Sequence, residues 1–114
     1  METVNLEHIK ETTLGDDEFM AELIDIYLDD VPPQLELLRA AVARADAAAA
    51  SSVAHRLKGS SGNVGAESLS ALCNQVERAG RQSRVDEVSR MMPQIEEEFG
   101  RVQACLVRIR NGYK

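Results

Sequence analysis

The chain has 114 residues, of which 44% are apolar, and 19 acidic against 13 basic side chains give it a formal net charge of −6. This length predicts a single domain, residues 1–114, with a core of moderate size. The acidic balance argues against nucleic acid and an anionic membrane surface as partners, because both favour a basic face. The apolar runs are too short to cross a membrane and the first residues lack a signal-peptide pattern, so we expect a cytoplasmic protein.

The hydrophobic pattern is helical throughout the chain. A short helix is predicted over about residues 5–13, with Asn5 as its N-cap. A long second helix is predicted to start near Asp16 and to continue, with a kink, through Pro32 and Pro33. Its predicted core positions are Phe19, Leu23, Ile26, Tyr27, Val31, Leu35, Leu38 and Val42.

Three further helices follow. Asp46 is a suitable cap for the third, which should end near Gly65, and the fourth should stop at about residues 80–83. Ser83 and Asp86 have capping-box spacing at the start of the fifth. Its apolar residues recur in steps of three and four: Val85, Val88, Met92, Ile95, Phe99, Val102, Leu106 and Ile109. We therefore predict an all-α fold, an antiparallel up-down four-helix bundle with a short extra N-terminal helix.

The third helix contains the candidate site, in the stretch AHRLKGSSGNVGA, residues 54–66. At about 100° per residue, His55 lies roughly 160° from the centre of the predicted core face, so its ring should point to solvent. That core face comprises Ala50, Val53, Leu57, Ser61 and Val64. Lys58 adds a cation one turn away, Gly59 leaves room for a partner, and Gly62 should extend this bare strip. A neutral imidazole is a nucleophile near pH 7, so the site could accept a negatively charged group; the alternative is an inert surface histidine, as expected for His8.

The longer stretch AHRLKGSSGNVGAESLSALCNQVE, residues 54–77, resembles the signature of histidine-containing phosphotransfer (HPt) domains. Residues 14–46 and 85–106 resemble the family's second and last helices. The resemblance implies that His55 carries a phosphoryl group between aspartates of receiver domains in a multistep two-component phosphorelay. It further implies that Lys58 steadies the phosphoryl group, Gly59 permits close docking and Glu77 orients the ring through its non-reacting nitrogen. Arg81 could add positive charge; for Glu77 and Arg81 the alternative is a solvated helix face.

The partners implied by the resemblance are receiver domains of hybrid histidine kinases and response regulators. They are expected to dock on the bare strip and on apolar residues outside the core, with basic residues at the rim. The residues expected there are Leu6, Ile9, Met20, Ile24, Leu28, Arg56 and Gly62. The alternative is that the apolar ones only hold the first helix against the second.

The sequence contains no P-loop, no kinase glycine-rich loop and no paired carboxylates for Mg²⁺. We therefore expect a monomeric covalent carrier without metal or cofactor, not an enzyme, with Mg²⁺ on the partner receiver. Cys73 and Cys105 lack metal-ligand spacing and should be reduced core residues.

Two other functions stay open: the phosphoacceptor domain of a chemotaxis-type histidine kinase, and a receiver-binding adaptor that is not phosphorylated. A chain that starts with Met and ends near Lys114 without a linker favours a free-standing carrier.

Overall fold

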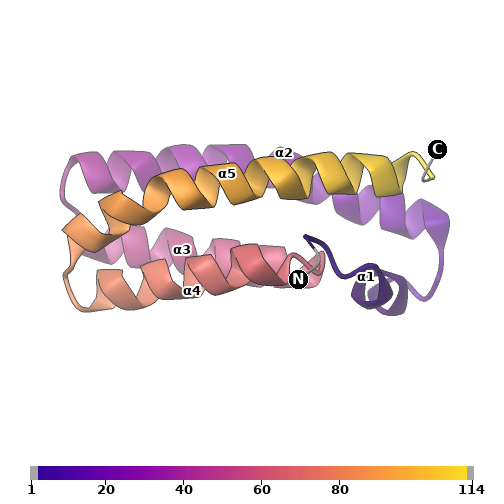
Figure 1. Ribbon diagram of the computed structural model, residues 1–114, viewed down its shortest axis with the longest axis horizontal. Helices are drawn as coiled ribbons and strands as arrows, with labels where there is room; N and C mark the ends of the chain where they lie inside the picture. The colour runs from indigo at the N-terminus through magenta and orange to yellow at the C-terminus, as the bar shows by residue number, and fades with distance from the viewer. Residues whose placement is uncertain (1–2, 113–114) are drawn as a thin grey trace.

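The computed structural model describes residues 3–112, and within that range the chain forms five helices and no strand (Figure 1). The helices are α1 (Leu6–Thr12), α2 (Asp17–Ala43), α3 (Ala47–Asn63), α4 (Glu67–Arg81) and α5 (Val85–Arg110). None of the helices in residues 3–112 is both long and apolar enough to span a membrane. The predicted all-helical fold is thus confirmed.

The four long helices lie along the longest axis of a body that measures 42 × 20 × 19 Å (Figure 1). Helix α2 packs against α3 and α5, and α4 packs against the same two helices. Helix α1 contacts α3 and lies at one end of the molecule, on the side of the α2 N-terminus.

Short polar side chains start the first three helices, as the sequence predicts. The side-chain oxygens of Asn5, Asp16 and Asp46 each accept a hydrogen bond from a backbone N–H in the first turn. The capping-box prediction for α5 is wrong. Ser83 has a φ of +59° and ends the α4 turn by donating its backbone N–H to Gly80 O. The N-cap of α5 is therefore Arg84, which makes no side-chain capping bond.

Helix α2 runs unbroken through Pro32 and Pro33, which confirms a single long helix. Its buried face is only partly the predicted one. Tyr27, Val31, Leu35 and Leu38 are buried, but Phe19 and Ile26 are 47% and 67% exposed. Met20 and Ile24 are buried in their place. Both sets have helical spacing, and the choice between them is made by packing, because Ile9 of α1 joins the same core cluster as Met20 and Ile24.

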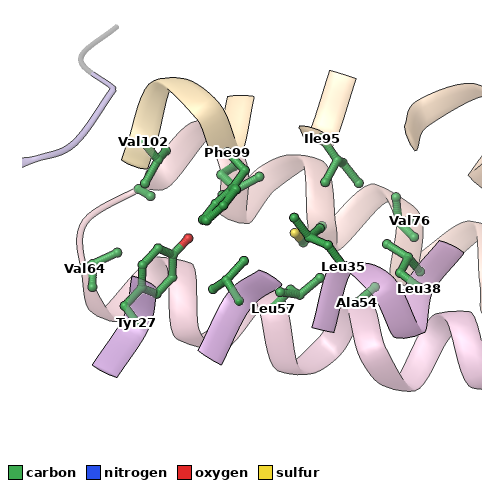
Figure 2. Packing of buried hydrophobic residues seen from close by; sticks show 14 of the residues in the cluster. Tyr27, Leu35, Leu38, Ala54, Leu57, Val64, Val76, Ile95, Phe99 and Val102 are labelled. Atoms are coloured by element: carbon green, nitrogen blue, oxygen red, sulfur yellow. The ribbon is translucent and has the colours of Figure 1, made fainter. Parts of the chain in front are cut away.

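The core lies between the four long helices, and Figure 2 shows its side chains pointing toward one another from α2, α3, α4 and α5. Near its centre the rings of Tyr27 and Phe99 have centroids 6.2 Å apart, and the Tyr27 hydroxyl shares a 2.9 Å hydrogen bond with Ser61 Oγ. The predicted core positions of α5 are all buried from Val88 onward, which confirms its seam. Cys73 is buried, whereas Cys105 is half-buried, and both are free thiols.

Candidate functional site

The His55 side chain projects from α3 into solvent and is 63% exposed, as predicted from the helical wheel. The surface one turn after His55 carries no side chain, and a Cβ added at Gly59 would meet no atom within 4 Å. Gly62 does not extend this strip as expected. It is half-buried and turned toward α4, where an added Cβ would lie 3.8 Å from Ser70 Oγ. The open surface beside the ring is therefore centred on Gly59.

A buried carboxylate lies beneath the exposed histidine. Glu77 projects from α4 with its side chain only 2% exposed, and its Oε2 lies 3.0 Å from His55 Nδ1. The predicted contact between Glu77 and the ring is confirmed, and a solvated position for Glu77 is wrong. An ionised carboxylate only accepts hydrogen bonds, so Nδ1 must carry the proton and donate. The neutral ring then keeps its lone pair on Nε2.

Two cations hold the Glu77 carboxylate from its other sides. Lys58 Nζ lies 2.6 Å from Oε1, and Arg81 Nη2 lies 2.6 Å from Oε2. Within residues 3–112, Oε1 has no hydrogen-bond partner other than Lys58, so Lys58 alone compensates that oxygen. Lys58 first, and then His55 and Arg81, hold the pKa of Glu77 below its ordinary value against the opposing effect of burial. The carboxylate is therefore ionised at neutral pH.

The close approach of α3 and α4 places this carboxylate under the ring. Gly80 makes the approach possible, because a Cβ there would lie 2.9 Å from both Ala47 O and Ser51 Cβ. Hydroxyl groups tie the two helices together: Ser51 Oγ donates to Glu77 O at 3.2 Å and Ser70 Oγ donates to Lys58 O at 3.0 Å. Sequence reasoning missed these contacts and treated Gly80 only as a stop signal for α4.

The expected partner-binding residues are not brought together at the surface. Ile9, Met20 and Ile24 are buried in the core, so their assignment to an exposed docking surface is wrong. Leu6 and Leu28 are half-buried against that core.

Other apolar side chains are exposed instead. They are Leu14, at 90%, in the α1–α2 connection, Phe19, Ile26 and Leu37 on α2, and Val107 on α5. Because the N-terminal half of α2 presents a different face to the core, Phe19 and Ile26, which were predicted to be core residues, are left in solvent.

A shallow depression opens beside the His55 ring. It is lined by Ser51, Ser52, His55, Arg56, Glu77 and Arg81. Arg56 is exposed, as expected for a residue at the rim. Within residues 3–112 no group of three or more His, Cys, Asp and Glu side chains is arranged to hold a metal ion.

Within residues 3–112 the helical fold presents the His55 imidazole to solvent and holds its Nδ1 on a buried carboxylate. The family model described as "Hpt domain" matches residues 22–109, more than half of the chain. The chain belongs to the Hpt domain family.

Two solved structures share its fold. The crystal structure of histidine-containing phosphotransfer protein B from Pseudomonas aeruginosa PAO1 is similar with a TM-score of 0.91 and 26% identity, over 98% of this chain and 97% of that one. The HPT domain of a sensor hybrid histidine kinase from Shewanella is similar with a TM-score of 0.80 and 23% identity, over 94% and 92% of the two chains. Among curated proteins, none matches the chain significantly.

Proposed function

We propose that this protein is a histidine phosphotransfer carrier of a multistep two-component phosphorelay, with His55 as its phosphoacceptor. The observation that carries the proposal is the 3.0 Å contact between His55 Nδ1 and the buried Glu77 carboxylate. This contact holds the proton on Nδ1 and leaves the Nε2 lone pair on a ring that is open to solvent. Membership of the Hpt domain family supports the same role.

The proposed reaction is a reversible exchange with an aspartyl phosphate. The Nε2 lone pair forms the N–P bond while the O–P bond to the receiver breaks, and the receiver aspartate leaves as a carboxylate. The ring becomes cationic, and its Nδ1–H stays on Glu77, whose negative charge balances it. Attack by a second receiver's aspartate reverses these changes. Such a transfer depends mainly on positioning and on compensating phosphoryl charge.

On this proposal the chain needs no cofactor of its own and is not an enzyme, because the receiver brings the acidic pocket and Mg²⁺. We further propose a monomer in the cytoplasm whose long helices form the antiparallel up-down bundle expected from the sequence, with α1 as the short extra helix. Three-residue connections between the long helices support this topology, since short connections join antiparallel neighbours.

We propose that the receiver docks across α2 and α3, over the bare surface at Gly59 and the exposed apolar residues Leu14, Phe19 and Ile26. A shallow hollow between the two helices supports this choice. It is lined by Leu23, Ile26, Tyr27, Asp30, Ser60, Asn63 and Val64. An exposed side chain as large as Ile26 beside such a hollow is suited to anchor a partner.

The first test is a phosphotransfer profile with labelled phospho-receivers from the same organism. The wild-type chain should take up label that is acid-labile and alkali-stable, as a phosphoramidate is, and His55→Gln should take up none. Label on the His55→Gln chain would refute the assignment. Receiver binding without any labelling of the wild type would point to the adaptor function instead.

The second test compares two apolar truncations in receiver binding. Ile26→Ala should weaken binding by about 1 kcal/mol or more, roughly fivefold in Kd, as for the loss of an interface anchor. Val107→Ala is the matched control, because Val107 is 41% exposed on α5. Equal affinities of the two variants would contradict the proposed surface.

A further inference from the structure

The cationic side chains around His55 differ in whether they are already paired with a carboxylate. Lys58 and Arg81 each lie 2.6 Å from an oxygen of the buried Glu77 carboxylate. Arg56, the residue after the histidine, is exposed and forms no ion pair with any residue in the range 3–112. The uncompensated cation next to the ring is therefore Arg56.

We propose that Arg56, and not Lys58, is the side chain that contacts the phosphoryl group on His55, because Glu77 retains Lys58 in the phosphorylated protein. This inference rests on the proposed function of His55. It differs from the expectation drawn from the sequence, which placed Lys58 at the phosphoryl group and Arg56 among the partner-binding residues.

Lys58 also donates to Asn74 Oδ1 at 3.5 Å, but the two anions that compete for its charge are Glu77 and the phosphoryl group, and these differ in burial. If Lys58 moved to the phosphoryl group, Glu77 Oε1 would stay buried with neither a cation nor an aligned donor, since Arg81 and His55 both engage Oε2. An uncompensated buried charge is strongly unfavourable. The phosphoryl group on an exposed ring would be hydrated, and an ion pair in solvent stabilises little. The balance favours the Lys58–Glu77 pair.

The shape of the surface favours Arg56 as well. Besides His55, the depression beside the ring is lined by Ser51, Ser52, Arg56, Glu77 and Arg81, and Lys58 is not part of its lining. Ser52 and Arg56 are four residues apart on α3 and therefore neighbours on its surface. A hydroxyl and a guanidinium with five N–H donors suit the oxygens of a phosphoryl group, which a guanidinium can bind in bidentate fashion.

The experiment measures the pKa of the phosphoryl group on His55 by ³¹P NMR titration. Phosphoramidate serves as donor: Nε2 forms the N–P bond, the donor's P–N bond breaks, and ammonia leaves. A cation in contact with the phosphoryl group favours its dianion and lowers that pKa. Arg56→Gln should raise it by about half a unit, as expected for a pair at an exposed position, and Lys58→Gln by clearly less. Arg108→Gln, which removes the same charge from an exposed position near the end of α5, is the control and should leave it unchanged.

A second pair of variants tests the role of Glu77. In Glu77→Gln the carboxylate no longer holds Lys58, so Lys58 should reach the phosphoryl group. Adding Lys58→Gln to that variant should then raise the phosphoryl pKa by more than Lys58→Gln does in the wild-type background. The proposal is overturned if Lys58→Gln matches or exceeds Arg56→Gln while Glu77 is present, or if Arg56→Gln behaves like Arg108→Gln.

Measurements on the unphosphorylated protein separate this inference from the proposed function. Lys58→Gln should lower the urea midpoint of unfolding and Arg56→Gln should not, because only Lys58 pairs with a buried charge. An unchanged midpoint in Lys58→Gln would overturn the retention of Lys58 whatever His55 does. A wild-type chain that gives no phosphohistidine signal, with this midpoint difference intact, would refute the function of His55 and the contact with Arg56 but not the pairing of Lys58 with Glu77.

Discussion

Two helical glycines allow one methyl group to be tested in opposite surroundings. Gly59 on α3 lies in the open, and a Cβ there would meet no atom within 4 Å. Gly80 on α4 faces α3, where a Cβ would lie 2.9 Å from Ala47 O and Ser51 Cβ and 3.0 Å from Ser51 N. Alanine at each position is the same chemical change, so any difference between the variants measures the space between α3 and α4.

The expected effects have opposite signs. Gly59→Ala should raise the free energy of unfolding by about 0.5–1 kcal/mol through helix propensity alone, with a rise in Tm of about 4 °C for a chain of this size. Gly80→Ala gains less from propensity in the last turn of α4, and two of its three short contacts are with backbone atoms that cannot rotate away. Forcing a methyl group into such a contact costs roughly 1–3 kcal/mol, so a net loss of about 1–2 kcal/mol is expected.

Urea and thermal unfolding followed by circular dichroism measure both variants. Changes of the same sign and size in the two proteins would refute the description of Gly80 as the point of close approach. A fall in Tm for Gly59→Ala would show that this position faces another part of the chain. Gly59→Gln should retain the stability and block transfer from a receiver, because its side chain would project onto the docking surface.

Three further outcomes follow from other parts of the molecule. The folded-state pKa of Glu77 is held below its ordinary value of 4.5, so its charge stabilises the protein above that pH. The difference in unfolding free energy between wild type and Glu77→Gln should therefore shrink as the pH falls through the lowered pKa. A difference that does not depend on pH would contradict this. Burial raises the pKa of the Cys73 thiol to about 12, so iodoacetamide should modify half-buried Cys105 faster, and equal rates in the native protein would argue against the burial of Cys73. Gly65→Ala should lower the unfolding free energy by more than about 1 kcal/mol, because Gly65 has a φ of +73° and an added Cβ would lie 2.6 Å from Asn5 O; an unchanged urea midpoint would contradict that contact.

Regular periodicity made α5 and the orientation of His55 predictable. The apolar residues of α5 define a single stripe from Val88 to Ile109, so only one face could be buried. On α3 the small and apolar residues likewise leave His55 on the opposite side. Short polar side chains marked the starts of α1 and α3, where Asn5 and Asp46 act as caps.

The N-terminal half of α2 was not predictable from the same reasoning. It carries two overlapping stripes with valid helical spacing, one that includes Phe19 and Ile26 and one that includes Met20 and Ile24. Which stripe is buried depends on the position of α1, whose Ile9 enters the core, and that is a tertiary contact.

The same limit applied to the charges of the site. The position of Lys58, three residues after His55, indicated that it binds the phosphoryl group. The spacing alone could not show that the Glu77 carboxylate competes with the phosphoryl group for Lys58. Glu77 comes from a different helix, and its burial under the ring depends on how closely Gly80 lets α4 approach α3. The exposed position of His55 was therefore predictable from the sequence and its contact with Glu77 from the family resemblance, whereas the pairing of Lys58 with Glu77 was not.

The attachment of the N-terminal segment has a consequence for the order of folding. Asn5 donates its backbone N–H to Gly65 O at 2.8 Å and its side-chain amide to Glu67 Oε1 at 3.2 Å, so the tie closes a loop of about sixty residues. Helices α3 and α4, in contrast, are joined by three residues and can pair as a local hairpin at small loop-closure entropy. We therefore expect α3 and α4 to be paired in the folding transition state and α1 to dock after it. Helix α1 would then also be the first unit to detach from the native protein, and detachment would uncover the core around Ile9 while the pairing of His55 with Glu77 stays in place.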